Sequence, residues 1–446
     1  MRELHDVYGR RYRVGETDRD LVGRSRTWML WAAWLAMLVA SSGQYGYGAL
    51  MPILGSTHGW SLAEGGWVFA VWILCQSATV YPAARLRVRI HVAPATTLLI
   101  GAALCGAGLV TLGTSSSIVV VLVNHGVLGG IGAGLIYGTC LGVVAMWYPE
   151  RPARTAFVSG AFAYGSIPFV VLAGQFAAPG DIEAFLALAG VAVIVLVGAA
   201  AMVLRDPPAY WWPSHVDPRE WAVDKSVNPG LRNNRPAIRR YTPVEMIRCP
   251  VSRLLYLAVT CATAVALFDI AYLAVFAADS GWGSGLAVVA LALLAAASGV
   301  TRTVAGWAGE AFGRGRVVRL ALYGGAVAQL MLLLSQERFA ALLLAGAALA
   351  GAAAGACFAL LPGLVEGHFG ERPGLPNFGV FYGAKAMGGL IGVALAGHVV
   401  STHGYPMVFL VATVLSLAGA GLVRLLRQPG RPGLFLPGSA KTVMSR

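Results

Sequence analysis

The fold class is decided by residues 182–204, which read IEAFLALAGVAVIVLVGAAAMVL. Glu183 is the only charged residue in this run. A helix needs about 20 apolar residues to cross the hydrocarbon core of a bilayer. The run therefore predicts a membrane-spanning helix, and Asp206-Pro207-Pro208 shortly after it predicts that a loop follows.

Apolar runs of helical length occur on both sides of this segment. Before it they are 28–54, 62–84, 92–113, 117–147 and 154–178, which we number spans 1 to 5, so that 182–204 is span 6. After the polar stretch 205–251 they are 252–278, 285–308, 316–334, 338–366, 376–400 and 405–426, spans 7 to 12. We therefore predict an all-α integral membrane protein with 12 transmembrane helices in two pseudo-symmetric six-helix halves. These halves are 28–204 and 252–426, with the tails 1–27 and 427–446 and the central loop 205–251 outside the bilayer.

The composition agrees with this class. Of 446 residues, 57% are hydrophobic and 12% are charged, and the mean hydropathy is +0.69. An ordinary soluble domain is roughly 25% charged, so these values exclude a disordered, collagenous or standard soluble protein. The six cysteines are scattered without a CxxC pair, and we expect no metal and no cofactor.

The net charge of +13, from 33 Lys and Arg against 20 Asp and Glu, could indicate nucleic acid binding or membrane topology. Thirty of the 33 basic residues fall on the tails, the central loop and the loops after spans 2, 4, 8 and 10. The opposite loops hold only Arg338. Because cytoplasmic loops carry the excess of Lys and Arg, we expect a plasma membrane protein with both termini in the cytoplasm. No nucleic acid partner is needed to explain the charge.

An internal repeat occurs at an offset of 221 residues. Glu150-Arg151-Pro152 recurs as Glu371-Arg372-Pro373, each in a loop after a glycine-rich span. Upstream, the equivalent pairs are Gly130 and Gly351, Gly134 and Gly355, and Tyr137 and Phe358. The match indicates two duplicated halves, although chance matching in a Gly- and Ala-rich sequence is the alternative. Glycines four residues apart also form a helical face that a neighbouring backbone can approach closely.

The two remaining basic residues, Arg302 in span 8 and Lys385 in span 11, lie inside predicted spans. A basic group at mid-span costs at least about 2.5–3.5 kcal/mol, so such groups face the bundle interior and usually have a function there. Arg302 is about 12 Å along its helix from Glu310, and Lys385 is equally far from Asn377. Two cations at one depth suit a small anion, since Arg offers a planar fork to a carboxylate and Lys adds a point charge.

Asp269 is the acidic residue deep in span 7. It lies roughly 12 Å beyond the two cations, too far for a direct ion pair. Two interpretations stay open, a proton-coupling site and a polar group at the outer mouth.

Polar and aromatic side chains within the spans could surround a carboxylate or pack in the core, namely Gln44, Tyr45, Gln76, Tyr137, Tyr164 and Tyr382. Near span ends, we expect tryptophans to anchor the chain at the membrane interface, namely Trp147, Trp211, Trp212 and Trp282.

The sequence GWAGEAFGR, residues 306–314, resembles the loop 8–9 signature of the major facilitator superfamily, with Glu310 in place of the usual Asp. The resemblance implies a gating motif that includes Gly306, Glu310, Gly313 and Arg314. The corresponding segment of the first half, 82–89, has no acidic residue, so the usual latch is not expected there.

Within the superfamily the chain resembles the oxalate:formate antiporter family. The resemblance rests on QYGYGAL (44–50), GWS (59–61), GIGAGLIYGTC (130–140), RYTPVE (240–245) and NFG (377–379) leading to Lys385. It implies that Arg302 and Lys385 are substrate-binding cations and that the cavity is lined by Gln44, Tyr45, Tyr137, Tyr164 and Tyr382. Where the family has Trp in an aromatic box this chain has Tyr382 and Ala354, which implies room for a larger carboxylate.

Together these features predict a monomeric secondary transporter that moves a small carboxylate across the lipid bilayer by alternating access, with oxalate/formate-type exchange as its mode. One alternative keeps the fold and couples a monocarboxylate to protons through Asp269. The other is an integral membrane enzyme. The eight histidines form no constellation with Ser or Asp at a span end and no metal spacing, so we expect no enzyme.

Overall fold

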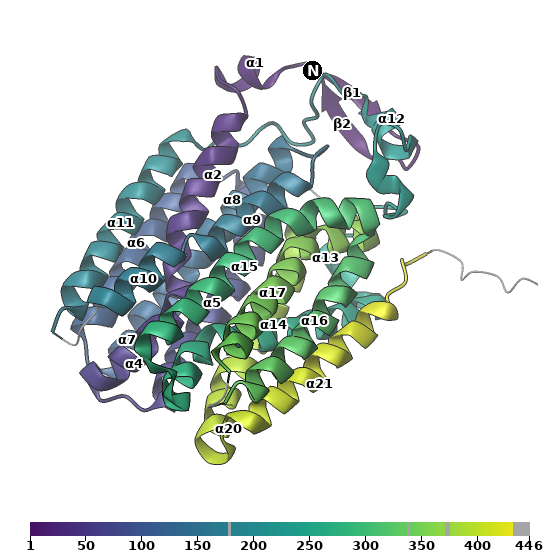
Figure 1. The fold of residues 1–446 in the computed structure, drawn as a ribbon. Helices are drawn as coiled ribbons and strands as arrows, with labels where there is room; N and C mark the ends of the chain where they lie inside the picture. The colour runs from purple at the N-terminus through teal and green to yellow at the C-terminus, as the bar shows by residue number, and fades with distance from the viewer. Residues whose placement is uncertain (177–179, 337–338, 371–374, 431–446) are drawn as a thin grey trace, which may run out of the picture.

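The computed structural model describes residues 1–176, 180–336, 339–370 and 375–430, and it is mostly helical (Figure 1). Ten helical runs among these residues are long and apolar enough to cross a membrane. One of them, Pro250–Phe312, contains two predicted spans, which meet at a non-helical Gly281. The first predicted span is divided into three shorter helices. The helical membrane class is confirmed, whereas the number of twelve spans stays a prediction.

The first half follows the predicted order of spans, and several spans consist of more than one helix. Its elements are α2 (Thr27–Ala40), α3 (Ser42–Tyr45), α4 (Tyr47–His58), α5 (Leu62–Ile90), α6 (Pro94–Thr114), α7 (Ile118–Val121), the π-helical η1 (Leu122–Gly129), α8 (Gly130–Trp147), α9 (Ala153–Tyr164), α10 (Ile167–Phe176) and α11 (Ile182–Val203).

The second half has the same general plan. Its elements are α14 (Pro250–Ala277), the π-helical η3 (Ala278–Trp282), α15 (Gly283–Phe312), α16 (Arg314–Leu334), α17 (Ala340–Phe369), α18 (Pro376–Tyr382), α19 (Ala384–Gly389), the π-helical η4 (Leu390–Leu395), α20 (Ala396–His403) and α21 (Tyr405–Arg424). The tail and central loop contain β1 (Arg2–His5), β2 (Arg11–Val14), α1 (Asp18–Val22), α12 (Pro218–Val223), the 3-10 helix η2 (Pro229–Arg232) and α13 (Pro243–Arg248).

The two halves lie beside each other, with the strands β1 and β2 and helix α12 at one end of the bundle (Figure 1). We call this end the tail end. The halves contact each other through α5 with α18 and α19 and through α9 with α15. These are spans 2 with 11 and 5 with 8, so the two contacts are equivalent in the repeat.

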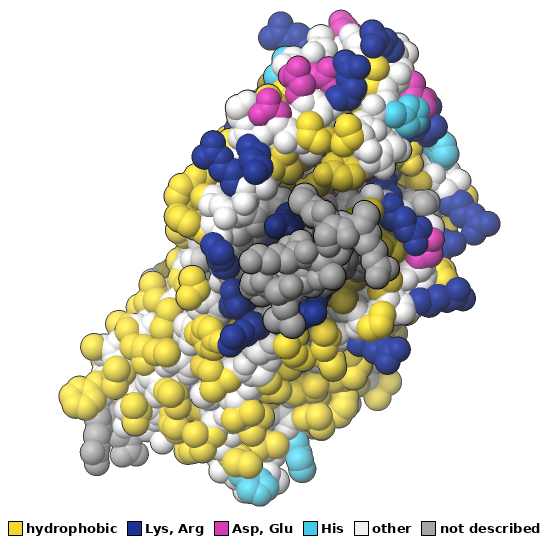
Figure 2. Space-filling model, turned by 90° about the vertical axis from the view of Figure 1, so that its right-hand side faces the viewer, with side chains coloured by type: hydrophobic (Ala, Val, Ile, Leu, Met, Phe, Trp, Pro, Cys, Tyr) yellow, Lys and Arg dark blue, Asp and Glu magenta, His cyan; other side chains and the backbone are white. Residues whose placement is uncertain are grey.

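The outer surface has the character expected of a membrane protein. Figure 2 shows hydrophobic side chains over much of the visible face away from the tail end, and most of the visible Lys and Arg side chains nearer to it. Exposed residues on α11, including Leu188, Val191 and Val195, belong to the apolar surface. A surface of this kind is stable against lipid chains rather than water.

The repeated glycines explain how each half packs. A Cβ on Gly134 of α8 would lie 2.4 Å from the backbone oxygen of Gln76 on α5. A Cβ on the equivalent Gly355 of α17 would lie 2.3 Å from the backbone oxygen of Ser298 on α15. Close approach of spans 4 and 2, and of spans 10 and 8, therefore depends on the missing side chains.

Several spans are kinked near their middle. Ser41 and Gly46 flank α3, Gly165 follows α9, and Gly383 separates α18 from α19. Backbone angles at these residues stay in the right-handed helical region, for example φ −69° and ψ −26° at Gly46. The interruptions are therefore kinks rather than unwound segments, and the predicted site residues at 44, 45, 164, 382 and 385 lie beside them.

The amino-terminal tail is folded onto the central loop. β1 and β2 form an antiparallel hairpin, and Arg13 of β2 forms a β-bridge with Trp211. Trp147, Trp211 and Trp212 are 0%, 4% and 3% exposed, and Trp147 packs edge-on against Trp211. The prediction that these three tryptophans anchor the chain at the membrane interface is wrong, because they form the packed contact between the tail, the central loop and α8.

Ion pairs join the loops at the tail end of the first half. Arg26 donates to Glu150 at 2.8 Å, in the first copy of the repeated loop. Arg87 on α5 donates to Asp206, at the start of the central loop, at 2.6 Å, so a basic residue of the 82–89 segment has an acidic partner from outside that segment. The second copy of the loop, Glu371-Arg372-Pro373, lies outside the described residues.

Candidate functional site

Lys385 is held at the kink of span 11 by side chains of the first half. Its Nζ donates to Oε1 of Gln44 at 2.6 Å and to Oε1 of Gln76 at 2.9 Å. It also donates to the hydroxyl of Tyr382 at 3.2 Å, one helical turn away. Three neutral oxygens therefore surround the ammonium group of Lys385, a residue that is 1% exposed.

Arg302 on α15 is also bound to the first half. Its Nη1 donates to the backbone oxygen and to Oγ of Ser159 on α9, at 2.9 and 3.0 Å. Its Nη2 donates to the hydroxyl of Tyr45 at 2.9 Å, and that hydroxyl lies 3.1 Å from Oγ of Ser298. Nε is buried and has no hydrogen-bond partner among the described residues. The Nε–H donor of the guanidinium is therefore unused within the described chain.

Phe358 on α17 contacts both cations. Its ring centroid is 4.8 Å from Cζ of Arg302 and 5.7 Å from Nζ of Lys385. One aromatic ring thus contacts both charges. Cation–π contacts of this kind are worth about 0.5–2 kcal/mol each. Arg302 and Lys385, which the sequence predicts at similar depth, therefore contact a single ring.

Neither cation has a carboxylate partner within the described part of the chain. The ion pairs there involve tail, loop and helix-end residues and include neither Arg302 nor Lys385. Charges taken out of water without an opposite charge are costly even when they are hydrogen-bonded. The centre of the protein is therefore suited to an anionic ligand.

Aromatic rings close one side of this centre. Tyr137 on α8 stacks on Tyr382 with centroids 4.8 Å apart, and it packs edge-on against Phe162. Tyr164 lies elsewhere: its hydroxyl is 2.5 Å from Nε1 of Trp34 on α2, and a Cβ on Gly299 would clash with its ring. The structure therefore places Gln44, Tyr45, Tyr137 and Tyr382 around the cations and Tyr164 at the contact of α2, α9 and α15.

Asp269 on α14 lies within the second half. Nε2 of Gln329 on α16 donates to both of its carboxyl oxygens, at 3.0 and 2.8 Å. The side chain is buried, being 3% exposed. Its described hydrogen bonds include neither cation, which agrees with the expected separation.

The predicted gating motif joins α15 to the first half and to the central loop. A Cβ on Gly306 would lie 2.8 Å from Cβ of Ala156 on α9, so the two helices touch there. Gly313 has φ 96°, which favours glycine, and it allows the turn into α16. Asn234 of the central loop accepts from the backbone N–H of Arg314 at 2.9 Å and donates to the oxygen of Gly309 at 2.8 Å. Oε1 of Glu310 has no hydrogen-bond partner among the described residues.

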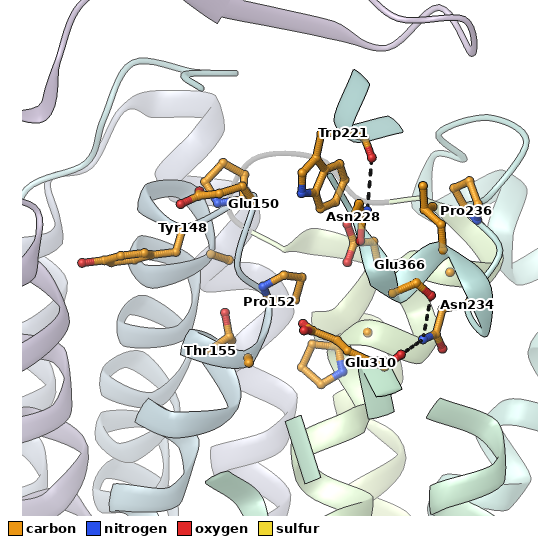
Figure 3. Close-up of a pocket in the computed structure, with 18 of the residues that line it drawn as sticks. Tyr148, Glu150, Pro152, Thr155, Trp221, Asn228, Asn234, Pro236, Glu310 and Glu366 are labelled. Carbon is orange, nitrogen blue, oxygen red and sulfur yellow. Dashed lines mark hydrogen bonds between the residues drawn. The ribbon is translucent and has the colours of Figure 1, made fainter. Parts of the chain in front are cut away.

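A cavity of about 700 Å³ opens at the tail end and leads toward the cations. Its lining includes Thr155 and Ala156 of α9, Gly306 of α15 and Ala359 of α17. These positions lie within one helical turn of Ser159, Arg302 and Phe358, so the cavity ends about 6 Å along the helices from the site. Figure 3 shows Thr155 and Glu310 on facing helices within it.

Four side chains of this centre are not among the cavity residues that the family resemblance implies. They are Gln76, Ser159, Ser298 and Phe358. Phe358 had a usable signal, because the repeat pairs it with Tyr137, which was predicted to line the cavity. Gln76 is one of the polar span residues that, from the sequence, could surround a carboxylate. Nothing in the sequence distinguishes Ser159 and Ser298 from other small polar residues that pack in helices.

The Major Facilitator Superfamily model matches residues 33–302 and 254–443. The chain belongs to the major facilitator superfamily. Its fold class is thereby confirmed, and its membership indicates a multi-pass membrane transporter rather than an enzyme.

Curated relatives and solved structures agree with this assignment. The oxalate:formate antiporter of Oxalobacter formigenes is 23% identical over 345 residues, which cover 76% of this chain and 77% of that protein. An uncharacterized 38 kDa protein of Thermoproteus tenax is 25% identical over 411 residues, 91% and 97% of the two chains. The crystal structure of the human organic anion transporter MFSD10 has a TM-score of 0.59 at 14% identity and covers 90% of this chain and 100% of its own. A mutant of the nucleoside transporter NupG has a TM-score of 0.64 at 12% identity and covers 90% and 99%. At these identities the solved structures show the shared fold alone.

Proposed function

We propose that this transporter exchanges small carboxylate anions across the plasma membrane and binds them between Arg302 and Lys385. The observation that carries the proposal is a pair of buried cations without a carboxylate partner in the described chain, held instead by neutral oxygens of the opposite half. The distant relationship to an oxalate:formate antiporter supports the same class of substrate.

The chemistry of the site fits a carboxylate. The unused Nε of Arg302 and its neighbouring Nη atoms form a fork that matches two carboxylate oxygens. Lys385 supplies a second positive charge against the same Phe358 ring. A dicarboxylate would use both cations, and a monocarboxylate would use one cation while the other keeps its amide partners.

Exchange follows from the electrostatics of the empty site. Without an anion, the two positive charges would have to move through a low-dielectric interior as the halves rock. A bound anion offsets this charge, so reorientation is favoured when the site is loaded. The same anion would replace Gln44 and Ser159 as partners of the cations and so weaken contacts between the halves. We propose that the basic tail end faces the cytoplasm and that the protein works as a monomer.

Proton-coupled symport is the weaker candidate. The carboxyl group of Asp269 is bonded to Gln329 inside the second half rather than to the cations or the site tyrosines. No observation connects it with the path of the substrate.

The test is uptake of labelled mono- and dicarboxylates into proteoliposomes preloaded with unlabelled anion. The single variants Arg302→Gln and Lys385→Gln should each lower exchange about 10- to 100-fold, because each removes a charged hydrogen-bond donor. Arg316→Gln, at an exposed position of the same charge, is the matched control and should exchange normally. Normal exchange by the Arg302→Gln, Lys385→Gln double variant would overturn the proposal.

A further inference from the structure

The cavity at the tail end is lined by more arginines than acidic residues, and none of these arginines belongs to the central site. Seven arginines and three glutamates are in its lining. One of the glutamates, Glu150, is already paired with Arg26. The arginines come mainly from the amino-terminal hairpin and the central loop, which together cover the mouth of the cavity.

Arg240 of the central loop is the arginine whose surroundings are most unusual. Its guanidinium lies over the rings of Tyr210 and Tyr12, at 5.3 and 5.8 Å from their centroids. It is partly buried, and no hydrogen bond or ion pair joins its side chain to another described residue. Arg11 lies over the same Tyr210 ring at 4.5 Å. Tyr210 therefore contacts two guanidinium groups.

Asp6, an acidic residue of the amino-terminal hairpin near Arg240, is already bound to other side chains. Asp6 accepts from Nε of Arg10 at 2.6 Å and from the hydroxyl of Tyr12 at 2.9 Å. Burial raises the pKa of Asp6, but hydrogen bonds and charge from Arg10 lower it further, so the net pKa lies below its ordinary value. This carboxylate neutralises Arg10, and no other described residue forms an ion pair with Arg240.

The backbone holds Tyr210 in an unfavourable conformation. Its φ is 66°, in the left-handed region that non-glycine residues rarely adopt. The conformation is secured by the hairpin, because Arg13 N–H donates to the oxygen of Tyr210 at 2.8 Å and Trp212 N–H donates to the oxygen of Arg13 at 2.9 Å. The folded amino-terminal hairpin therefore fixes the position of the Tyr210 ring against which Arg11 and Arg240 pack.

We propose that Arg240 and Arg11, on the ring of Tyr210, form a second and peripheral site that captures the carboxylate substrate at the tail-end mouth of the cavity. The same cavity lining runs from these residues to Gly306, one turn from Arg302. A guanidinium binds a carboxylate through two parallel hydrogen bonds. A positive mouth with low-dielectric walls raises the local concentration of anions. This inference rests on the proposed function, since it requires an anionic substrate.

The test compares Arg240→Gln with Arg239→Gln. Arg239 is the adjacent arginine, is exposed, and is paired with Glu245 at 2.8 Å, so the control removes the same charge from the same loop. Initial exchange rates are measured in phosphatidylcholine vesicles with the tail end outward. We expect Arg240→Gln to raise KM for outside carboxylate about three- to fivefold with an unchanged maximal rate. The difference should shrink as salt is added, and it should be absent when substrate is varied on the opposite side.

The outcomes separate this proposal from the proposed function. If the wild type exchanges carboxylates and both variants share its KM, the peripheral site is refuted while the central site stands. A KM difference that arises only when acidic phospholipid is added would assign Arg240 to a lipid headgroup and would also refute it. Arg240→Lys, which keeps the charge, should recover part of the KM, whereas a purely structural defect would lower the melting temperature of both Arg240 variants. If the wild type exchanges no carboxylate, the proposed function itself fails.

Discussion

The ammonium group of Lys385 lies 2.6 Å from the side-chain oxygen of Gln44, and this hydrogen bond joins the two halves at the centre of the protein. Gln44 belongs to the kinked span 1 and Lys385 to the kinked span 11. A cation of one half is thus satisfied by an amide of the other. A substrate carboxylate would compete with this amide for the same donor.

Gln44→Glu should therefore inhibit exchange. The new carboxylate would form a buried ion pair with Lys385, and such a pair is costly to break once it is formed. We expect the rate of carboxylate exchange to fall about tenfold or more, since hydrogen bonds to charged groups contribute about 1.5–3 kcal/mol. Gln44→Met, neutral and of similar size, is the control and should retain more activity. Equal activity of the two variants would argue against substrate binding at Lys385.

Phe358→Leu should weaken substrate binding without unfolding the protein. The ring contacts both Arg302 and Lys385, and a lost cation–π contact leaves each cation less well oriented. Contacts worth about 0.5–2 kcal/mol predict a two- to thirtyfold increase in KM, measured in proteoliposomes. Phe358→Tyr keeps the ring and should remain close to the wild-type KM. A normal KM in Phe358→Leu would mean that the ring only fills space.

Asp269→Asn should leave exchange within about twofold of the wild type, since an asparagine oxygen can still accept from Gln329 at a comparable net energy. Uptake is measured with and without an imposed pH gradient. Gln329→Leu, in contrast, leaves a buried carboxyl group without its amide and should lower stability by about 1–3 kcal/mol in a thermal unfolding assay. Uptake that depends on the pH gradient and disappears in Asp269→Asn would instead establish proton coupling.

Gly355→Ala should destabilise the second half. The added Cβ would lie 2.3 Å from the backbone oxygen of Ser298, next to the turn that carries Arg302. Overpacking of this kind costs about 1–3 kcal/mol, so the melting temperature in detergent should fall. Gly421→Ala is the matched control, because it lies in helix α21 with no atom within 4 Å of the added Cβ. An equal change of melting temperature in both variants would show that the α15–α17 contact does not require Gly355.

The sequence alone predicts the membrane class of this protein, its expected topology and its two buried cations. Apolar runs of helical length predict a membrane protein because each span must bury its own backbone hydrogen bonds, and this is a local property. The distribution of basic residues over the loops, and the presence of Arg302 and Lys385 within spans, can likewise be read directly from the sequence. The glycine spacing also predicted close helix packing, because glycines four residues apart form one helical face that a neighbouring backbone can approach.

The partners of the charged groups depended on tertiary structure. Lys385 meets Gln44 and Gln76, and Arg302 meets Ser159, over separations of more than a hundred residues. Such contacts depend on which helix faces turn toward each other across the two halves, and hydrophobicity that is nearly uniform around a helix does not report this. The same is true of the amide partner of Asp269 and of the tryptophans at the tail end, where packing of the tail on the central loop replaced the membrane interface as the environment of Trp211.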